Sequence, residues 1–114
     1  MTPLTSPLSW DSWIAALESD KYEQTEGGLR DKDKFCCLGV ACDIHNKDGW
    51  IRDLHGDFFI YALGDVKIGG YLPDVLNDHL QLKTGEQEEL ARLNDSGKTF
   101  KEIAAHLRSI RGDR

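Results

Sequence analysis

The sequence predicts an α+β domain in which N-terminal helices are followed by a small antiparallel sheet of two or three strands and a C-terminal helical hairpin. Apolar residues recur at helical spacing near the start and through the last third of the chain. Between these parts, residues 50–71 are rich in β-forming residues and are divided by turn-like dipeptides. A chain of 114 residues can bury one hydrophobic core, so we expect a single domain over residues 1–114.

The first helix is predicted to begin after Ser9, a favourable N-cap residue, and to end near Ser19. Its apolar positions fall at i, i+3, i+4 and i+7: Trp10, Trp13, Ile14 and Leu17. Leu8, just before the cap, is placed to pack on Trp13 as a hydrophobic staple.

A polar segment follows over residues 22–34. Its dipeptide Gly27-Gly28 predicts a tight turn between two short extended pieces. The alternating charges of residues 30–34 predict a solvated loop.

A second helix is predicted from Phe35, because apolar side chains again recur at helical spacing, and residues 46–49 close it. Inside a helix Gly39 costs about 1 kcal/mol relative to Ala. We therefore expect a neighbouring element to approach the backbone closely at Gly39.

Three cysteines lie in this segment, in the stretch FCCLGVAC. The spacing C-C-x4-C does not match the paired ligands of zinc sites, and Cys36 and Cys42 would be about 240° apart around a helix. A nucleophilic role stays open, because a helix start could lower the pKa of Cys36 or Cys37 and a histidine could supply a base. Cysteine is also among the most buried residue types, so we expect all three to pack in the core.

The strand region contains the segments WIRDL, FFIYAL and VKI, which predict an antiparallel meander. The dipeptide Gly69-Gly70 then breaks the pattern before Tyr71. The following helix is predicted to start at Leu72-Pro73. Its expected buried set is Val75, Leu76, His79 and Leu80.

Two capping boxes are predicted for the hairpin, Thr84 with Gln87 and Thr99 with Glu102. Gly97 is expected at the C′ position that ends the first of the two helices. The second helix carries apolar residues at regular helical spacing: Phe100, Ile103, Ala104, Leu107 and Ile110.

The formal net charge is −6, and it is unevenly distributed. Residues 1–99 carry a net charge of −8, and residues 100–114 a net charge of +2. Such a charge disfavours nucleic-acid binding, which needs several phosphates neutralised by Lys and Arg. It either serves solubility alone or forms an acidic surface that docks on a basic protein.

The stretch LARLNDSGKTFKEIAAHL resembles the first two helices of a bacterial helix-turn-helix unit. The DNA-reading helix would have to follow Leu107, where only RSIRGDR remains. We therefore expect the hairpin over residues 84–110 to serve packing, and a DNA-binding regulator is the less favoured hypothesis.

A possible anion-binding set consists of Arg108 and Arg111 with Lys101 nearby. Aromatic residues available to stack on a base are Trp50, Phe58, Phe59 and Tyr61. The alternative is that the arginines only favour the C-terminal helix dipole.

No catalytic arrangement is visible, and we expect neither a cofactor nor a metal. The carboxylates do not pair in opposed surroundings, and Asp74 and Asp78, at i and i+4, predict a solvated helix face. No apolar run reaches the roughly 20 residues that span a bilayer. The start also lacks a secretory signal, so a cytoplasmic location is expected.

The ordered motifs W-x-x-W-I-A-A-L, F-C-C-L-G-V-A-C-D, Y-L-P-x-x-V and L-N-D-x-G-K-T-F-K-E-I-A resemble a family of small uncharacterised accessory proteins of tailed bacteriophages and prophages. The resemblance covers most of the chain and is weakest over residues 50–68. It implies a phage accessory protein in the bacterial host cytoplasm and brings no catalytic residues.

The resemblance and the charge together suggest a protein that binds and blocks a host protein, such as a component of antiviral defence. The residues expected in such an interaction are Asp53, Asp57, Asp65, Phe58 and Phe59. The alternative is an oligomeric protein that sequesters a nucleotide signal through the anion-binding set.

Overall fold

The computed structural model describes residues 8–52, 58–63 and 66–111, and it confirms the α+β class. In chain order its elements are α1 (Trp10–Glu18), β1 (Glu23–Gln24), β2 (Arg30–Asp31), β3 (Lys34–Phe35), α2 (Cys37–His45), β4 (Trp50–Arg52), β5 (Phe58–Leu63), β6 (Val66–Ile68), α3 (Asp74–Leu80), α4 (Glu86–Asp95) and α5 (Phe100–Arg111).

The sheet of the described residues is larger than predicted. Its strand order is β1-β3-β2-β5-β4, and β6 also pairs with β5. The predicted meander corresponds to β4, β5 and β6, which pair antiparallel. The remaining strands come from the polar segment, where β1 and β3 pair in parallel and β2 pairs antiparallel with both β3 and β5.

The expected loop over residues 30–34 is therefore wrong in part, because both of its ends are strands. Arg30 pairs with Phe59 and Asp31 with Phe58, so β5 holds β2 in place across a long sequence separation. Charged side chains on such a short strand resemble those of a loop, which explains the error. The chain bends before β2, where the glycine pair predicts a turn, and Gly27 has a φ of +86°.

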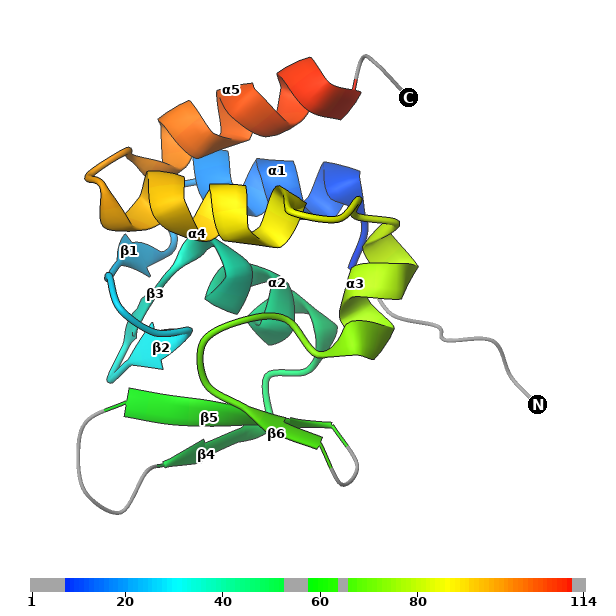
Figure 1. Cartoon of the computed structure of the whole chain (residues 1–114). Coiled ribbons are helices and arrows are strands. Elements are labelled where there is room, and N and C mark those ends of the chain that lie inside the picture. The colour runs from blue at the N-terminus through cyan, green and yellow to red at the C-terminus, as the bar shows by residue number, and fades with distance from the viewer. Residues whose placement is uncertain (1–7, 53–57, 64–65, 112–114) are drawn as a thin grey trace.

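The layers are visible in Figure 1, with α5 at one end of the molecule and the strands β4, β5 and β6 at the other. Helix α1 contacts both α5 and α2, and α4 likewise contacts both of them. Helix α2 also contacts β3, so it lies between helices and sheet. Its residues 37–43 are all buried, which a helix with neighbours on every side requires.

The predicted close approach at Gly39 is confirmed. A Cβ added to Gly39 would lie 1.9 Å from the carbonyl oxygen of Leu29. The N–H of Cys36 donates to the same oxygen at 3.0 Å, so the loop before β2 runs directly over the start of α2.

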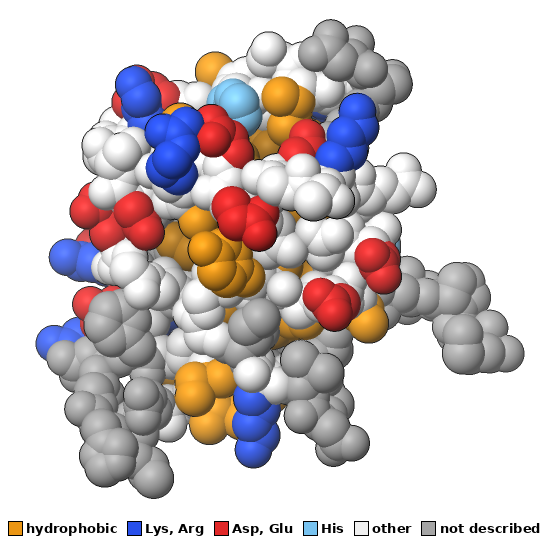
Figure 2. Space-filling view, viewed as in Figure 1, with side chains coloured by type: hydrophobic (Ala, Val, Ile, Leu, Met, Phe, Trp, Pro, Cys, Tyr) orange, Lys and Arg blue, Asp and Glu red, His pale blue; other side chains and the backbone are white. Residues whose placement is uncertain are grey.

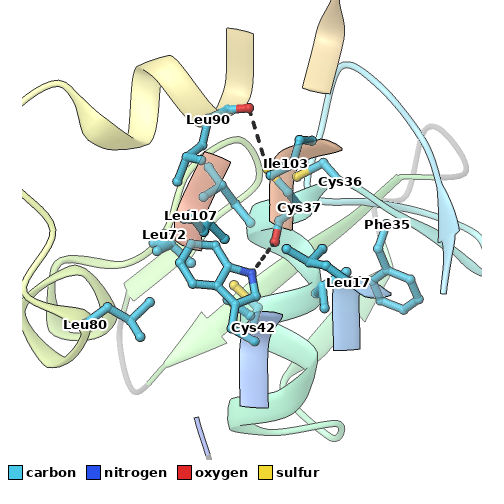
Figure 3. Packing of buried hydrophobic residues seen from close by; sticks show 14 of the residues in the cluster. Leu17, Phe35, Cys36, Cys37, Cys42, Leu72, Leu80, Leu90, Ile103 and Leu107 are labelled. Atoms are coloured by element: carbon cyan, nitrogen blue, oxygen red, sulfur yellow. Dashed lines mark hydrogen bonds between the residues drawn. The ribbon is translucent and has the colours of Figure 1, made fainter. Parts of the chain in front are cut away.

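All three cysteines are free and buried, as expected for a packing role. Figure 3 shows them among leucine and isoleucine side chains from several helices. The indole Nε1 of Trp13 donates to the carbonyl of Cys37 at 2.9 Å, and the Cys37 thiol donates to the carbonyl of Leu90 at 3.5 Å. Helices α1, α2 and α4 therefore meet at Cys37.

Three predicted helix ends are confirmed. Ser9 caps α1 in a capping box with Ser12. Thr99 and Glu102 exchange hydrogen bonds of 3.0 and 3.1 Å at the start of α5. After α4, Gly97 has a φ of +97° and a Schellman pattern of bonds runs from residues 97 and 98 to residues 94 and 93.

Two expectations for the last third are wrong. No capping box forms at Thr84, because α4 begins one residue later, at Glu86, after Gly85 with a φ of +86°. Val75 is 51% exposed, because the short helix α3 turns only Leu76 and Leu80 fully inward. His79 is half-buried, and its Nε2 lies 2.6 Å from the carbonyl oxygen of Leu8.

Candidate functional site

Tyr71 stands exposed between two anchored parts of the chain. On its N-terminal side the carbonyl of Gly69 accepts the N–H of Leu29 at 2.8 Å. On its C-terminal side Leu72 is buried, and its N–H donates to the side-chain oxygen of Gln87 at 2.7 Å. Tyr71 is nevertheless 45% exposed, although such a residue usually buries most of its apolar area.

Two hollows adjoin Tyr71, and its side chain lines both. The larger has a volume of about 380 Å³ and lies between the start of α3 and the start of α4; besides Tyr71 its lining includes Asp74, Leu82, Lys83 and Glu88. The smaller has a volume of about 150 Å³ and is lined by Gly27, Gly28, Cys36, Gly70, Tyr71, Ala91 and Asp95. We call Tyr71 with these two hollows the Tyr71 surface.

The Tyr71 surface is predominantly acidic. Among its described lining residues the carboxylates are Asp74, Glu88 and Asp95, and the single cation is Lys83. All four are exposed. Figure 2 shows this face of the molecule, with hydrophobic side chains near its centre and acidic side chains around them. An exposed aromatic ring surrounded by carboxylates suits a basic, partly apolar partner.

The larger hollow has a polar floor. The side-chain nitrogen of Gln87 donates to Oδ1 of Asn77 at 2.7 Å, and Nδ2 of Asn77 donates to the carbonyl of Leu82 at 3.4 Å. Together with the bond from Leu72 to Gln87, these contacts fix the turn from α3 into α4. The hollow is therefore held open by a connected hydrogen-bond network.

Asn94 is a completely buried polar residue that holds the smaller hollow in shape. Its Oδ1 accepts the N–H of Cys37 at 3.2 Å and the side-chain amide of Gln24 at 2.9 Å. Its Nδ2 donates to the carbonyl of Thr25 at 2.7 Å. The next residue, Asp95, accepts the N–H of Gly27 at 3.1 Å. Asn94 and Asp95 thus join α4 to α2 and to the glycine pair Gly27-Gly28.

A second polar cluster joins α2 to the sheet. The buried carboxylate of Asp43 accepts the hydroxyl of Tyr22 at 2.7 Å and Nε1 of Trp50 at 3.1 Å. Burial, followed by the hydrogen bond to Asp43, raises the pKa of Tyr22. Nearby, the guanidinium of Arg30 lies 4.1 Å from the ring centroid of Phe59. These groups are occupied with one another, which indicates a structural role.

The predicted anion-binding cations lie together on α5 but contact acidic residues. Nε and Nη2 of Arg108 donate to the two carboxylate oxygens of Glu18, at 3.2 and 2.7 Å. Arg111 pairs with Asp11, and Lys101 lies 3.5 Å from Asp20. Because α1 supplies Asp11 and Glu18, and Asp20 follows two residues after its end, the three pairs fasten α5 to α1.

The predicted stacking residues lie far from those cations. Trp50, Phe58, Phe59 and Tyr61 belong to β4 and β5, at the end of the molecule opposite α5 in Figure 1. Tyr61 is completely buried, and its hydroxyl lies 2.6 Å from Nδ1 of His45. The structure does not bring the predicted ligand residues together.

Of the five residues expected in a protein interaction, Asp53, Asp57 and Asp65 lie outside the described residues. Phe58 and Phe59 belong to β5, where they pair with β2. Phe59 is half-buried against Arg30.

The cysteine thiols lie in surroundings that oppose nucleophilic chemistry. Burial raises the pKa of Cys36 to about 11 and raises the pKa of Cys37 and Cys42 well above the ordinary value. Desolvation thus outweighs the helix start, which was expected to lower the pKa of Cys36 or Cys37. Within the described ranges, no three His, Cys, Asp or Glu side chains gather as metal ligands.

Apart from Cys36, which the sequence offers as a nucleophile, the residues of the Tyr71 surface are not predicted as site residues by the sequence. A glycine pair followed by an aromatic residue and then Leu-Pro is a weak signal that this aromatic residue stands on an exposed connection. The hollows form where residues 27–28, 70–74 and 84–95 come together in the fold. The spacing of residues in the sequence does not predict which of these segments will be neighbours.

The fold and the site define a small α+β protein with a hollowed acidic face. The family model that matches the chain is described as a domain of unknown function (DUF8296), and it covers residues 9–67, from the N-cap of α1 into β6. The match spans more than half of the 114 residues, and the chain belongs to this family. No curated protein and no solved structure matches the chain.

The matched residues supply only part of the Tyr71 surface. Gly27, Gly28 and Cys36 lie within the match, whereas Tyr71 and the residues contributed by α3 and α4 follow it. In the part of the chain that the structure describes, no helix has the length and apolar character needed to cross a membrane.

Proposed function

We propose that the protein acts by binding a basic partner protein through the Tyr71 surface. The observation that carries this proposal is the exposed ring of Tyr71, which two hollows flank and carboxylates surround. Interface centres are enriched in tyrosine, because its large ring loses little conformational entropy on binding. Opposite charge on the partner would guide the encounter.

The resemblance to phage accessory proteins supports a bacterial host protein as the partner, such as a component of antiviral defence. Covering a basic surface of such a protein would block it without any chemical step. The net charge of −6 fits this mode of action, since a basic target attracts an acidic ligand over a distance of about a Debye length.

Affinity capture from a bacterial lysate tests the proposal when matched variants are run side by side. The test variant is Tyr71→Ser. The control is Ile51→Ser on β4, because Ile51 is 43% exposed and Tyr71 45%. We expect a basic protein that wild type and Ile51→Ser retain and Tyr71→Ser loses, with retention falling as NaCl is raised. A capture pattern that does not change with Tyr71→Ser would refute the proposal.

A further inference from the structure

The smaller hollow of the Tyr71 surface has the size and the walls of a side-chain pocket. A cavity of about 150 Å³ holds a molecule of benzene's size. A Cβ added at Gly27 or Gly70 would have no heavy atom of the rest of the structure within 4 Å, so open space adjoins these walls. Cys36 also lines the hollow and is only 6% exposed, and burial raises the pKa of its thiol, which is therefore neutral at pH 7.

One carboxylate is held at the hollow in a fixed position. Oδ1 of Asp95 accepts the N–H of Gly27 at 3.1 Å and Nδ2 of Asn94 at 3.3 Å. Among the described residues, both hydrogen bonds that this carboxylate accepts go to Oδ1. The carboxylate is therefore oriented by the fold while its Oδ2 is available to a ligand.

We infer that this hollow binds a lysine side chain of the partner protein, an inference that rests on the proposed function. The apolar stem of lysine would lie along the ring of Tyr71 and Ala91, and its ammonium group would meet Asp95. Lysine fits better than arginine, because guanidinium prefers a carboxylate with both oxygens available, and an ammonium group needs only one.

Titration of the labelled protein with short peptides tests the inference by ¹H–¹⁵N NMR. The probes are acetyl-Gly-Gly-Lys-Gly-Gly-amide and the same peptide with norleucine or arginine in place of lysine. We expect the lysine peptide to shift the amides of Gly27, Gly70 and Asp95, with a dissociation constant at least fivefold below that of either other peptide. Equal shifts from lysine and norleucine peptides, or shifts confined to other residues, would overturn the inference.

Two variants and one control make the assignment specific. Asp95→Asn keeps an oxygen that can accept from Gly27, and we expect it to weaken lysine-peptide binding at least fivefold. Ala91→Leu narrows the hollow without changing charge and should have a similar effect. Glu88→Gln, in the larger hollow, should change binding less than twofold. Unchanged binding by folded Asp95→Asn would refute the inference.

Failure here is separable from failure of the proposed function. If Tyr71→Ser abolishes capture of a basic protein and the lysine peptide causes no shift at the hollow, the protein-binding proposal stands and the lysine assignment falls. If Tyr71→Ser leaves capture unchanged, the proposed function falls whatever the peptide titration gives.

Discussion

Gly39 in α2 packs so closely on the carbonyl oxygen of Leu29 that a Cβ at position 39 would lie 1.9 Å from this oxygen. The contact places the loop before β2 on the start of α2, so the glycine sets the position of the turn that lines the smaller hollow. The packing next to the candidate site therefore requires a residue without a side chain at position 39.

Gly39→Ala should therefore destabilise the protein, although alanine is the better helix former by about 1 kcal/mol. A Cβ at 1.9 Å from an oxygen forces the backbone apart, and overpacking of this kind costs about 1–3 kcal/mol or more. Chemical denaturation measures the loss. Gly69→Ala is the control, because a Cβ there meets nothing within 4 Å and should change stability by no more than about 0.5 kcal/mol. A neutral Gly39→Ala would contradict the packing shown.

Asn94→Ala should be among the most destabilising polar substitutions in the chain. It leaves the buried N–H of Cys37 and the carbonyl of Thr25 without their partner, and each unsatisfied group costs about 1–3 kcal/mol. We expect a total loss of about 2–4 kcal/mol in the free energy of unfolding. The exposed Asn46, whose Oδ1 accepts the N–H of Asp48, provides the control, and Asn46→Ala should lose less than half as much.

The pairs between α1 and α5 predict an acid-sensitive contact. The Arg108 guanidinium beside Glu18 holds the pKa of that carboxyl below its usual value, first through the hydrogen bond. A lowered folded-state pKa means that the stabilisation is present above the unfolded-state pKa and is lost as pH falls through the folded one. The melting temperature of wild type should therefore exceed that of Glu18→Gln at pH 7, and the gap should close towards pH 3.

Glu23→Gln is the matched control for this experiment, because Glu23 is exposed on β1 and is a member of none of the three pairs described between α5 and the α1 region. Its melting temperature should follow that of wild type over the same pH range. High NaCl should reduce the gap between wild type and Glu18→Gln at pH 7, since exposed pairs are screened. A gap that is constant from pH 7 to pH 3 would show that the pair contributes through packing rather than charge.

Native cysteine reactivity should be low. Because burial raises the pKa of Cys36 to about 11, and that of the other two thiols well above normal, little thiolate forms at pH 7.5. Ellman's reagent should modify all three thiols rapidly in guanidinium chloride and at least a hundredfold more slowly in the native state. Rapid modification of one native thiol would reopen the nucleophilic hypothesis.

The features predicted well from sequence are those that depend on near neighbours. The caps at Ser9 and Thr99 and the stop at Gly97 are made by residues within five positions of each other. The periodic apolar face of α5 is likewise local, and its buried residues are those that the spacing predicts.

Most of the errors have the same cause, which is a partner distant in sequence. Strand β2 is only two residues long and depends on pairing with β5. The side-chain oxygen of Gln87 accepts the N–H of Leu72, whereas the sequence predicts a capping box between Gln87 and Thr84. The sequence predicts Arg108 and Arg111 as ligand-binding residues, but in the structure both pair with carboxylates of α1. The exposure of Tyr71 also depends on where α3, α4 and the glycine turn meet.

Site-specific photocrosslinking tests the central claim most directly, because it reports what touches the Tyr71 surface inside cells. Benzoylphenylalanine would be placed at position 71 in one protein and at position 51 in its control, and bacteria producing each would be irradiated. We predict one prominent adduct with a basic protein from position 71 and none of that adduct from position 51. The absence of an adduct at position 71, or the same adducts from both positions, would contradict a partner bound at Tyr71.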